Sequence, residues 1–122
     1  MIRKRKVEDY MRVVYSLLST KGTAKGADIA RHFGVSKPTV SESLKALADE
    51  GYLKKLPDNS VVLTDKGMEI ARRITERNNG IYRLLTKLGV NEATAVKDAC
   101  NMEHVISHES FAALVGLIGE NG

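Results

Sequence analysis

The sequence predicts a mainly α-helical protein with a small β-wing, in which a winged helix-turn-helix is followed by a wholly helical region. Three observations lead to this fold class. Two amphipathic helix patterns lie close together in residues 27–48, a hairpin pattern follows in residues 52–63, and apolar residues beyond Thr64 recur only at helical spacing. We expect two domains, residues 1–75 and residues 76–122.

The first helix is expected over residues 7–19, because apolar side chains recur there on one face and Lys21 and Gly22 then end the pattern. A second, short helix is expected over residues 27–32. Gly34 would supply the tight turn that follows it. The apolar face of the first helix consists of Val7, Met11, Val14 and Leu18.

The third helix is expected to open at Ser36, and Pro38 suits its first turn, where a missing N–H costs nothing. Val40, Leu44 and Leu47 then recur at helical spacing, so one face is buried and the opposite face is polar. Small polar and charged side chains at the start of such a helix can reach base edges and phosphates in a major groove. The predicted DNA-contacting residues are Ser36, Lys37, Pro38, Thr39, Ser41, Glu42 and Lys45.

A hairpin is expected next, because residues 52–56 and 60–63 flank turn-forming residues 57–59. Beside the third helix it would form a basic-edged wing. The charge is unevenly distributed: residues 1–66 contain 13 Lys and Arg against 8 Asp and Glu, whereas residues 67–122 contain 6 against 7. The positive excess accompanies the predicted reading helix and favours double-stranded DNA as the partner.

The rest of the chain predicts further helices. Thr64 would cap a long helix that continues or restarts after residues 78–80, and Asn91 would cap a helix over residues 92–104. The last helix begins near Ser107. It carries more apolar side chains than so small a region can bury, which predicts a homodimer held by residues beyond about 81. These side chains are Phe111, Ala112, Leu114, Val115, Leu117 and Ile118.

The composition restricts the location of the protein. Within its 122 residues no apolar run approaches the roughly 18 needed to span a bilayer, and the basic N-terminus is not followed by the apolar core of a signal peptide. A single cysteine cannot form an internal disulfide, which agrees with a reducing compartment. We therefore expect a cytoplasmic protein without a membrane partner.

The segment from Cys100 to His104 is the second informative feature. On a helix, positions i, i+3 and i+4 share a face, so Cys100, Glu103 and His104 would bring a thiol, a carboxylate and an imidazole together. These are donors for a transition metal. In the alternative interpretation Cys100 is a small core residue, Glu103 is solvated and His104 is hydrogen-bonded inside the fold.

A catalytic interpretation of this segment is disfavoured. Cys100 as a nucleophile with His104 as base would need a third, orienting group and an oxyanion-hole loop, and the sequence offers neither. We therefore expect no enzymatic activity and no small-molecule substrate.

Several motifs in a fixed order resemble the iron- and manganese-dependent transcriptional repressors of the diphtheria toxin repressor type, which include the manganese transport regulators. The resemblance covers nearly the whole chain. It implies a homodimer whose metal-bound form binds a palindromic operator and represses metal-uptake genes, without the SH3-like domain that longer members add. The motifs are Glu-Asp-Tyr-Met-Arg at residues 8–12, Ser-Lys-Pro-Thr-Val-Ser at 36–41, Glu-Gly-Tyr-Leu at 50–53, Leu-Thr-Asp-Lys-Gly at 63–67 and Cys-x-x-Glu-His at 100–104.

The resemblance also implies an activating metal site formed by Asp9, Cys100, Glu103 and His104. A soft thiolate beside nitrogen and oxygen donors favours Fe(II), while Mn(II), Co(II), Ni(II) or Zn(II) could also bind. Manganese-selective relatives tend to carry a carboxylate at the position of Cys100.

The remaining ligand positions of the family fall on poor ligands, so a second ion is not expected. His108 is either a substitute ligand or, as is commoner, an exposed or helix-capping residue. An alternative function is a metal-independent DNA-binding regulator or a protein-interaction adaptor with a vestigial metal site. The poor ligands are Arg12 or Tyr82, Asn78 and Val96.

Overall fold

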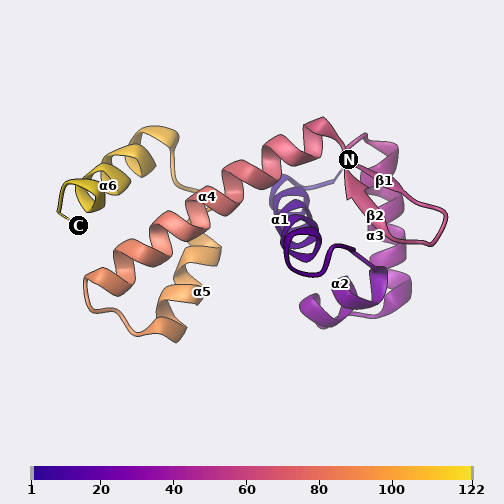
Figure 1. Cartoon of the computed structure of the whole chain (residues 1–122), viewed down its shortest axis with the longest axis horizontal. Coiled ribbons are helices and arrows are strands. Elements are labelled where there is room, and N and C mark those ends of the chain that lie inside the picture. Colours follow the sequence, from indigo (N-terminus) through magenta and orange to yellow (C-terminus); the bar gives the residue numbers. More distant parts are fainter. Residues whose placement is uncertain (1, 122) are drawn as a thin grey trace. The chain divides into compact units, whose positions relative to one another are not determined.

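The computed structural model describes residues 2–121, with side chains described as far as residue 117. The chain forms two compact units that divide between Arg72 and Arg73 (Figure 1). Among the described residues, no helix is both long and apolar enough to cross a membrane. The elements are α1 (Lys4–Lys21), α2 (Gly26–Phe33), α3 (Lys37–Asp49), β1 (Leu53–Lys55), β2 (Val61–Leu63), α4 (Asp65–Lys87), α5 (Glu92–Met102) and α6 (His108–Asn121). The predicted fold class is confirmed.

The first unit is a three-helix core closed by the wing. Met11 and Val14 of α1 are fully buried, as are Ile29 of α2 and Leu47 of α3. These are the side chains that recur at helical spacing in the sequence, so each helix buries the face that its periodicity predicts. α1 ends at Lys21, and the next residue, Gly22, has a φ of +79° and bonds its N–H to a carbonyl of the preceding turn.

The start of α3 is fixed by its cap. Ser36 Oγ accepts a hydrogen bond from the Thr39 N–H at 3.3 Å, and Pro38 lies within the first turn. Gly34, with a φ of +67°, makes the turn that separates α3 from α2. Local sequence signals therefore set where the third helix begins.

The wing is a two-stranded antiparallel sheet in which Leu53 pairs with Leu63 and Lys55 with Val61. Leu53 and Val61 face the core. The Val61 N–H also bonds to the Ala24 carbonyl at 2.9 Å, which ties the wing to the segment before α2. The wing is thus held against the helices rather than projecting from them.

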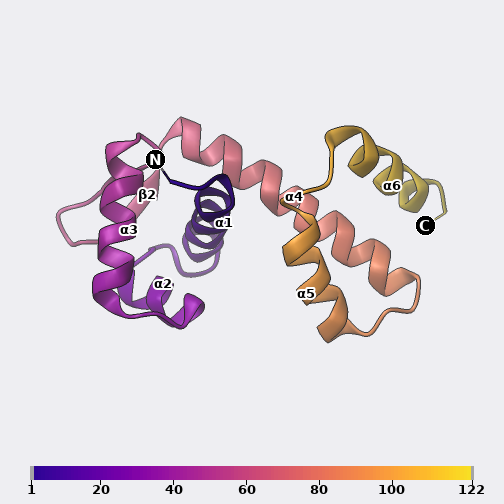
Figure 2. The same cartoon turned by 180° about the vertical axis from the view of Figure 1, so that it is seen from behind.

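The second unit packs α5 and α6 against the second half of α4 (Figure 2). Its buried centre is Ile81, Ala99 and Phe111. α4 continues without a break through residues 78–80. The sequence had allowed either a continuous helix or a second helix starting there. A Cβ on Gly80 would lie 2.8 Å from the Phe111 ring, so the glycine is there for close packing rather than as a helix break.

Two expectations for this unit need correction. α5 ends at Met102, two residues earlier than expected, because the Met102 carbonyl accepts bonds from both Val105 and Ile106 in a closing turn. Not all apolar residues of α6 are left for a partner. Phe111 is buried in the core of the second unit, and Val115 packs against that core. Leu117 stays 52% exposed. The Ile118 side chain lies outside the described residues.

The packing at Gly80 gives the first prediction. Gly80→Ala should lower the free energy of unfolding by about 1–3 kcal/mol, because the added methyl group overpacks the Phe111 ring. Urea denaturation followed by circular dichroism measures this. In a Phe111→Leu background the same substitution should cost less, and equal costs in both backgrounds would contradict the assigned contact.

Candidate DNA-reading surface and metal centre

The predicted DNA-contacting residues lie on the outward side of α3 and its cap. Val40, Leu44 and Leu47 are buried on the opposite side, so helical geometry turns Pro38, Glu42 and Lys45 outward. The surface is therefore accessible along its length. The exposed set is Ser36, Lys37, Pro38, Thr39, Ser41, Glu42 and Lys45.

A groove beside α3 adds residues that the motifs did not single out. Lys25 and Lys55 line it together with Lys37 and Ser41 of α3. Lys25 precedes α2 and Lys55 belongs to the wing, so only the tertiary fold brings them together. In the sequence, the adjacent pair Lys54 and Lys55 in the wing was the one indication that basic residues would line this groove.

The tip of the wing is ordered by Asp58. Its Oδ1 accepts hydrogen bonds from the Ser60 hydroxyl at 2.6 Å and from the Ser60 N–H at 3.0 Å. The Ser60 hydroxyl, followed by the Ser60 N–H, holds the pKa of Asp58 below its usual value of 3.8. Asn59 adopts a left-handed φ of +67° between them. The turn thus depends on a charged carboxylate.

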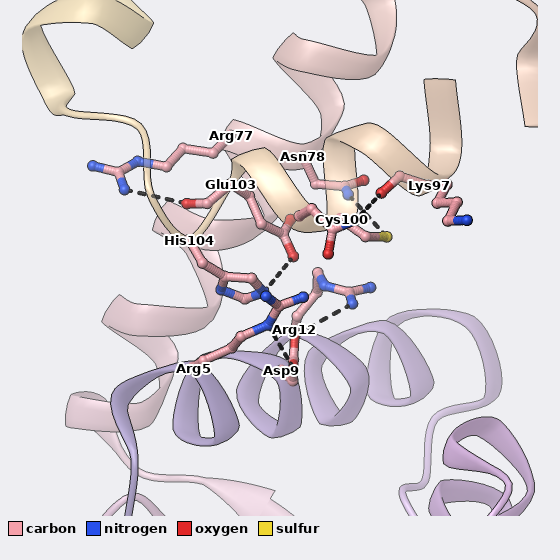
Figure 3. A network of polar contacts seen from close by, with 10 residues as sticks. Arg5, Asp9, Arg12, Arg77, Asn78, Lys97, Cys100, Glu103 and His104 are labelled. Carbon is pink, nitrogen blue, oxygen red and sulfur yellow. Dashed lines mark hydrogen bonds and ion pairs between the residues drawn. The ribbon is translucent and has the colours of Figure 1, made fainter. Parts of the chain in front are cut away.

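In the second unit, Cys100, Glu103 and His104 lie at and just beyond the end of α5 (Figure 3). Cys100 carries a free, half-buried thiol, and Asn78 Nδ2 donates to its Sγ at 3.7 Å. Glu103 caps α5, and Arg77 Nη1 donates to its carbonyl oxygen at 3.4 Å. The polar groups of this segment are therefore positioned by α4.

Glu103 and His104 form a buried pair. The Glu103 side chain is 0% exposed and that of His104 is 3% exposed, with His104 Nε2 3.4 Å from Glu103 Oε1. The alternative interpretation is therefore wrong in its solvated Glu103, whereas its half-buried Cys100 and buried His104 agree with the structure. A buried carboxylate beside a buried imidazole has donor chemistry that fits a divalent transition-metal ion. The Cys100 Sγ faces Asn78 instead, and among the described residues it belongs to no group of three donors within 4.8 Å of one another.

Asp9 lies on α1, in the first unit. Its two carboxylate oxygens face Arg5 Nε at 3.9 Å and Arg12 Nη2 at 3.8 Å (Figure 3). The Asp9 side chain is 27% exposed. Asp9 is therefore an accessible carboxylate between two guanidinium groups.

The structure also places the positions where the sequence has poor ligands. Tyr82 packs against the second core, and Val96 is 52% exposed. His108 is exposed at the start of α6. The α6 cap is Ser107, whose Oγ accepts from the Ser110 N–H at 3.1 Å, so His108 does not fill that role.

Comparison with known families matches the two halves of the chain to two domains of one family. Residues 4–61 match the N-terminal DNA-binding domain of the iron-dependent repressors, and residues 64–121 match their metal-binding and dimerisation domain. The chain belongs to the iron-dependent repressor family. Members are metal-dependent DNA-binding transcriptional repressors and not enzymes, which excludes the thiol-dependent catalyst.

Individual relatives agree with this assignment. The transcriptional regulator MntR of Salmonella typhimurium is 34% identical over 120 residues, covering 98% of this chain and 76% of that protein. The HTH-type transcriptional regulator MntR of Listeria welshimeri is 32% identical over 105 residues, or 86% of this chain and 74% of that protein. The chain thus spans about three quarters of these relatives.

Solved structures share the fold. A manganese-dependent transcriptional repressor in complex with manganese superposes with a TM-score of 0.82 at 26% identity, covering 93% of this chain and 52% of that one. ScaR with bound Zn²⁺ gives 0.73 at 28% identity, covering 93% and 53%. The chain therefore spans about half the length of these structures.

The wing tip gives the second prediction. Because the carboxylate of Asp58 is the form stabilised in the fold, its contribution to stability is present above about pH 3.8 and lost as the pH falls through the lowered pKa. Ser60→Ala should raise the pKa of Asp58 towards 3.8, measured by carboxyl-carbon NMR titration. A midpoint unchanged by Ser60→Ala would remove Ser60 as the cause.

Proposed function

We propose that the protein is a homodimeric repressor that binds a palindromic operator when one divalent transition-metal ion is bound to each chain. The observation that carries this proposal is the buried donor pair of Glu103 and His104, in a chain whose other unit is a winged helix-turn-helix. Both halves match the corresponding domains of one repressor family, which supports it further.

The proposed ligands are Asp9, Cys100, Glu103 and His104. Cys100 lies in the last turn of α5, Glu103 and His104 follow it in the chain, and Asp9 is proposed because it matches the family's ligand pattern. A bound ion would supply the positive charge that draws these donors together. Holding α1 to the second unit in this way would fix the spacing of the two reading helices in a dimer, which couples ion binding to operator affinity.

We propose one ion per chain rather than two. Arg12 carries a positive charge, the Val96 side chain has no donor atom, and Tyr82 is partly buried against the core of the second unit. Asn78 already directs its amide to the Cys100 sulfur at 3.7 Å. Each of these side chains is unsuited to hold a second cation.

We propose Fe(II) as the preferred ion, because a thiolate adds more to the affinity for Fe(II) than for Mn(II). Relatives of this chain include manganese-dependent repressors, so Mn(II) is the competing assignment. The side chain at position 100 distinguishes the two, since a carboxylate there would suit Mn(II) better than the cysteine does.

The dimer is proposed to form through the second unit. This unit matches a metal-binding and dimerisation domain, and it exposes large apolar side chains. Leu117 of α6 is 52% exposed, and Leu88, which directly follows α4, is 71% exposed. A second copy of the chain would remove such surface from water.

The metal proposal gives the third prediction. Co(II) titration of the full chain should produce a thiolate-to-cobalt charge-transfer band that is absent in Cys100→Ala. Cys100→Ala should lower affinity for Co(II) far more than for Mn(II), while Cys100→Glu should lose the band and retain Mn(II) binding. Affinity should fall as the pH falls, because protons compete for the thiolate and the imidazole.

His108→Ala is the matched control for His104→Ala. Only the latter should weaken Co(II) binding, because His108 is exposed at the start of α6. Absence of the cobalt band, together with operator binding that is indifferent to a chelator, would refute metal activation and favour the metal-independent regulator.

The dimer gives the fourth prediction. Leu117→Glu should convert the dimer to monomer at micromolar concentration and abolish operator binding, because it places a charge in an apolar interface. Ala112→Glu adds the same charge to another face of α6 and should leave the dimer intact. Sedimentation velocity measures both, and a monomeric wild-type chain with and without metal would exclude this assembly.

A further inference from the structure

We infer that a pocket in the first unit binds a small aromatic carboxylate. The pocket lies between the start of α1, the end of α2 and the first half of α3, and it encloses about 490 Å³. Small-molecule sites in proteins have volumes of this order, and they combine an apolar lining with a few placed polar groups. This pocket has such a lining, because it joins an aromatic wall, a basic rim and a buried hydroxyl group.

The wall of the pocket is apolar. Tyr10, Phe33 and Val35 form it, and the Tyr10 and Phe33 rings stack with their centroids 4.7 Å apart. Val35 is 41% exposed, so the wall presents apolar surface to water. Aromatic rings pack favourably against the faces and edges of other rings. A planar aromatic ligand would therefore extend the stack and remove Val35 from water.

The rim of the pocket is positively charged because it includes the beginning of α1. Arg3 is the N-cap of this helix, and Arg5 and Lys6 lie in its first turn. The first turn contains no acidic residue, and the Arg3 side chain makes no capping hydrogen bond. Positive side chains are unfavourable at a helix N-terminus, where unbonded N–H groups already carry partial positive charge. A bound anion would offset this charge and stabilise the start of the helix.

The charges around the pocket favour an anion over a cation. Lys6 Nζ lies 6.0 Å from the centroid of the Tyr10 ring, so a carboxylate on a ring stacked against the wall would come close to this ammonium group. Asp9 also lines the pocket, and its oxygens face Arg5 Nε at 3.9 Å and Arg12 Nη2 at 3.8 Å. The lining therefore has three cationic side chains against one carboxylate, whose charge guanidinium groups offset.

Ser43 of α3 supplies the buried hydroxyl group. It lines the pocket and is 5% exposed. In the described part of the chain the Ser43 hydroxyl has no hydrogen-bond partner, whereas that of Thr39, one turn earlier, is bonded to Ser36 Oγ at 2.8 Å. Buried polar groups are normally hydrogen-bonded, because desolvation without a partner costs free energy. A carboxylate oxygen of the ligand would provide that partner.

The pocket adjoins the predicted DNA-contacting residues through Thr39, which belongs to both sets. A carboxylate bound beside Thr39 would repel DNA phosphates, so the ligand should weaken operator binding. By linkage, the operator would weaken ligand binding by the same factor. This consequence rests on the proposed function, whereas ligand binding itself does not.

Fluorescence titration with 2-naphthoate tests the pocket on the full, metal-free chain. The chain contains no tryptophan, so the emission of the probe is easily distinguished. We expect one saturable site per chain with a dissociation constant of about 1 mM or below, and much weaker binding of the uncharged 2-naphthamide. Val35→Gln, Lys6→Gln and Ser43→Ala should each weaken 2-naphthoate binding by about fivefold or more, because they alter the wall, the rim and the hydroxyl group.

Lys4→Gln is the matched control for Lys6→Gln. Lys4 lies in the same first turn of α1 but does not line the pocket, so its substitution should leave the affinity for 2-naphthoate close to that of the wild type. Thermal unfolding of each variant checks that the fold persists. The inference would be overturned by absence of a saturable site or by equal affinities of the two lysine variants. Displacement of 2-naphthoate by an equal concentration of inorganic phosphate would also overturn it, because a simple anion site needs no aromatic wall.

Duplex binding separates this inference from the proposed function. With Co(II) present, saturating 2-naphthoate should lower the affinity of the wild-type chain for a duplex selected from a random library, measured by fluorescence anisotropy, and Val35→Gln should lose this effect. An unchanged duplex affinity, or an equal decrease in Val35→Gln, would overturn the coupling. A chain that binds 2-naphthoate but no duplex, with or without metal, would overturn the proposed function and leave the pocket assignment standing.

Discussion

The burial of one side of α3 is the constraint on which the first unit depends. Val40, Leu44 and Leu47 are inserted into the core formed with α1 and α2, which fixes the rotation of the helix about its axis. The outward direction of Glu42 and Lys45 follows from that rotation, because positions on a helix are separated by fixed angles. The surface presented to a partner is therefore determined by apolar packing on the hidden side.

Local signals predicted the helices and their caps. Ser36, Ser107 and Asn91 each accept a hydrogen bond from a backbone N–H of the helix that follows, as their residue types indicate. The unbroken course of α4 through residues 78–80 was not decided by sequence, because the need for a glycine at position 80 arises from the Phe111 ring of α6. Such a contact joins residues distant in the chain.

In the candidate sites, too, some features follow from local sequence and others only from contacts between distant segments. The spacing of Cys100, Glu103 and His104 predicted that their side chains would meet on one helix face, but α5 ends at Met102 and the Cys100 thiol faces Asn78. The full burial of the Glu103 carboxylate was not predicted either. The groove residues Lys25 and Lys55 belong to different elements, and no local pattern relates them. Proximity within a helix can be read from spacing, whereas burial and the assembly of distant segments require the tertiary fold.

The continuity of α4 affects how the chain can be divided. The family domains meet between residues 61 and 64, yet Gly67 and Ala71 of α4 pack into the first unit, and the compact units divide only after Arg72. A cut after Arg72 would sever α4 within its hydrogen-bonded length. Up to four carbonyl groups and four N–H groups at the new ends would then have only water as partners. Isolated halves would therefore begin or end in frayed helical turns, so fragments cut there would underestimate the cooperativity of unfolding of the intact chain.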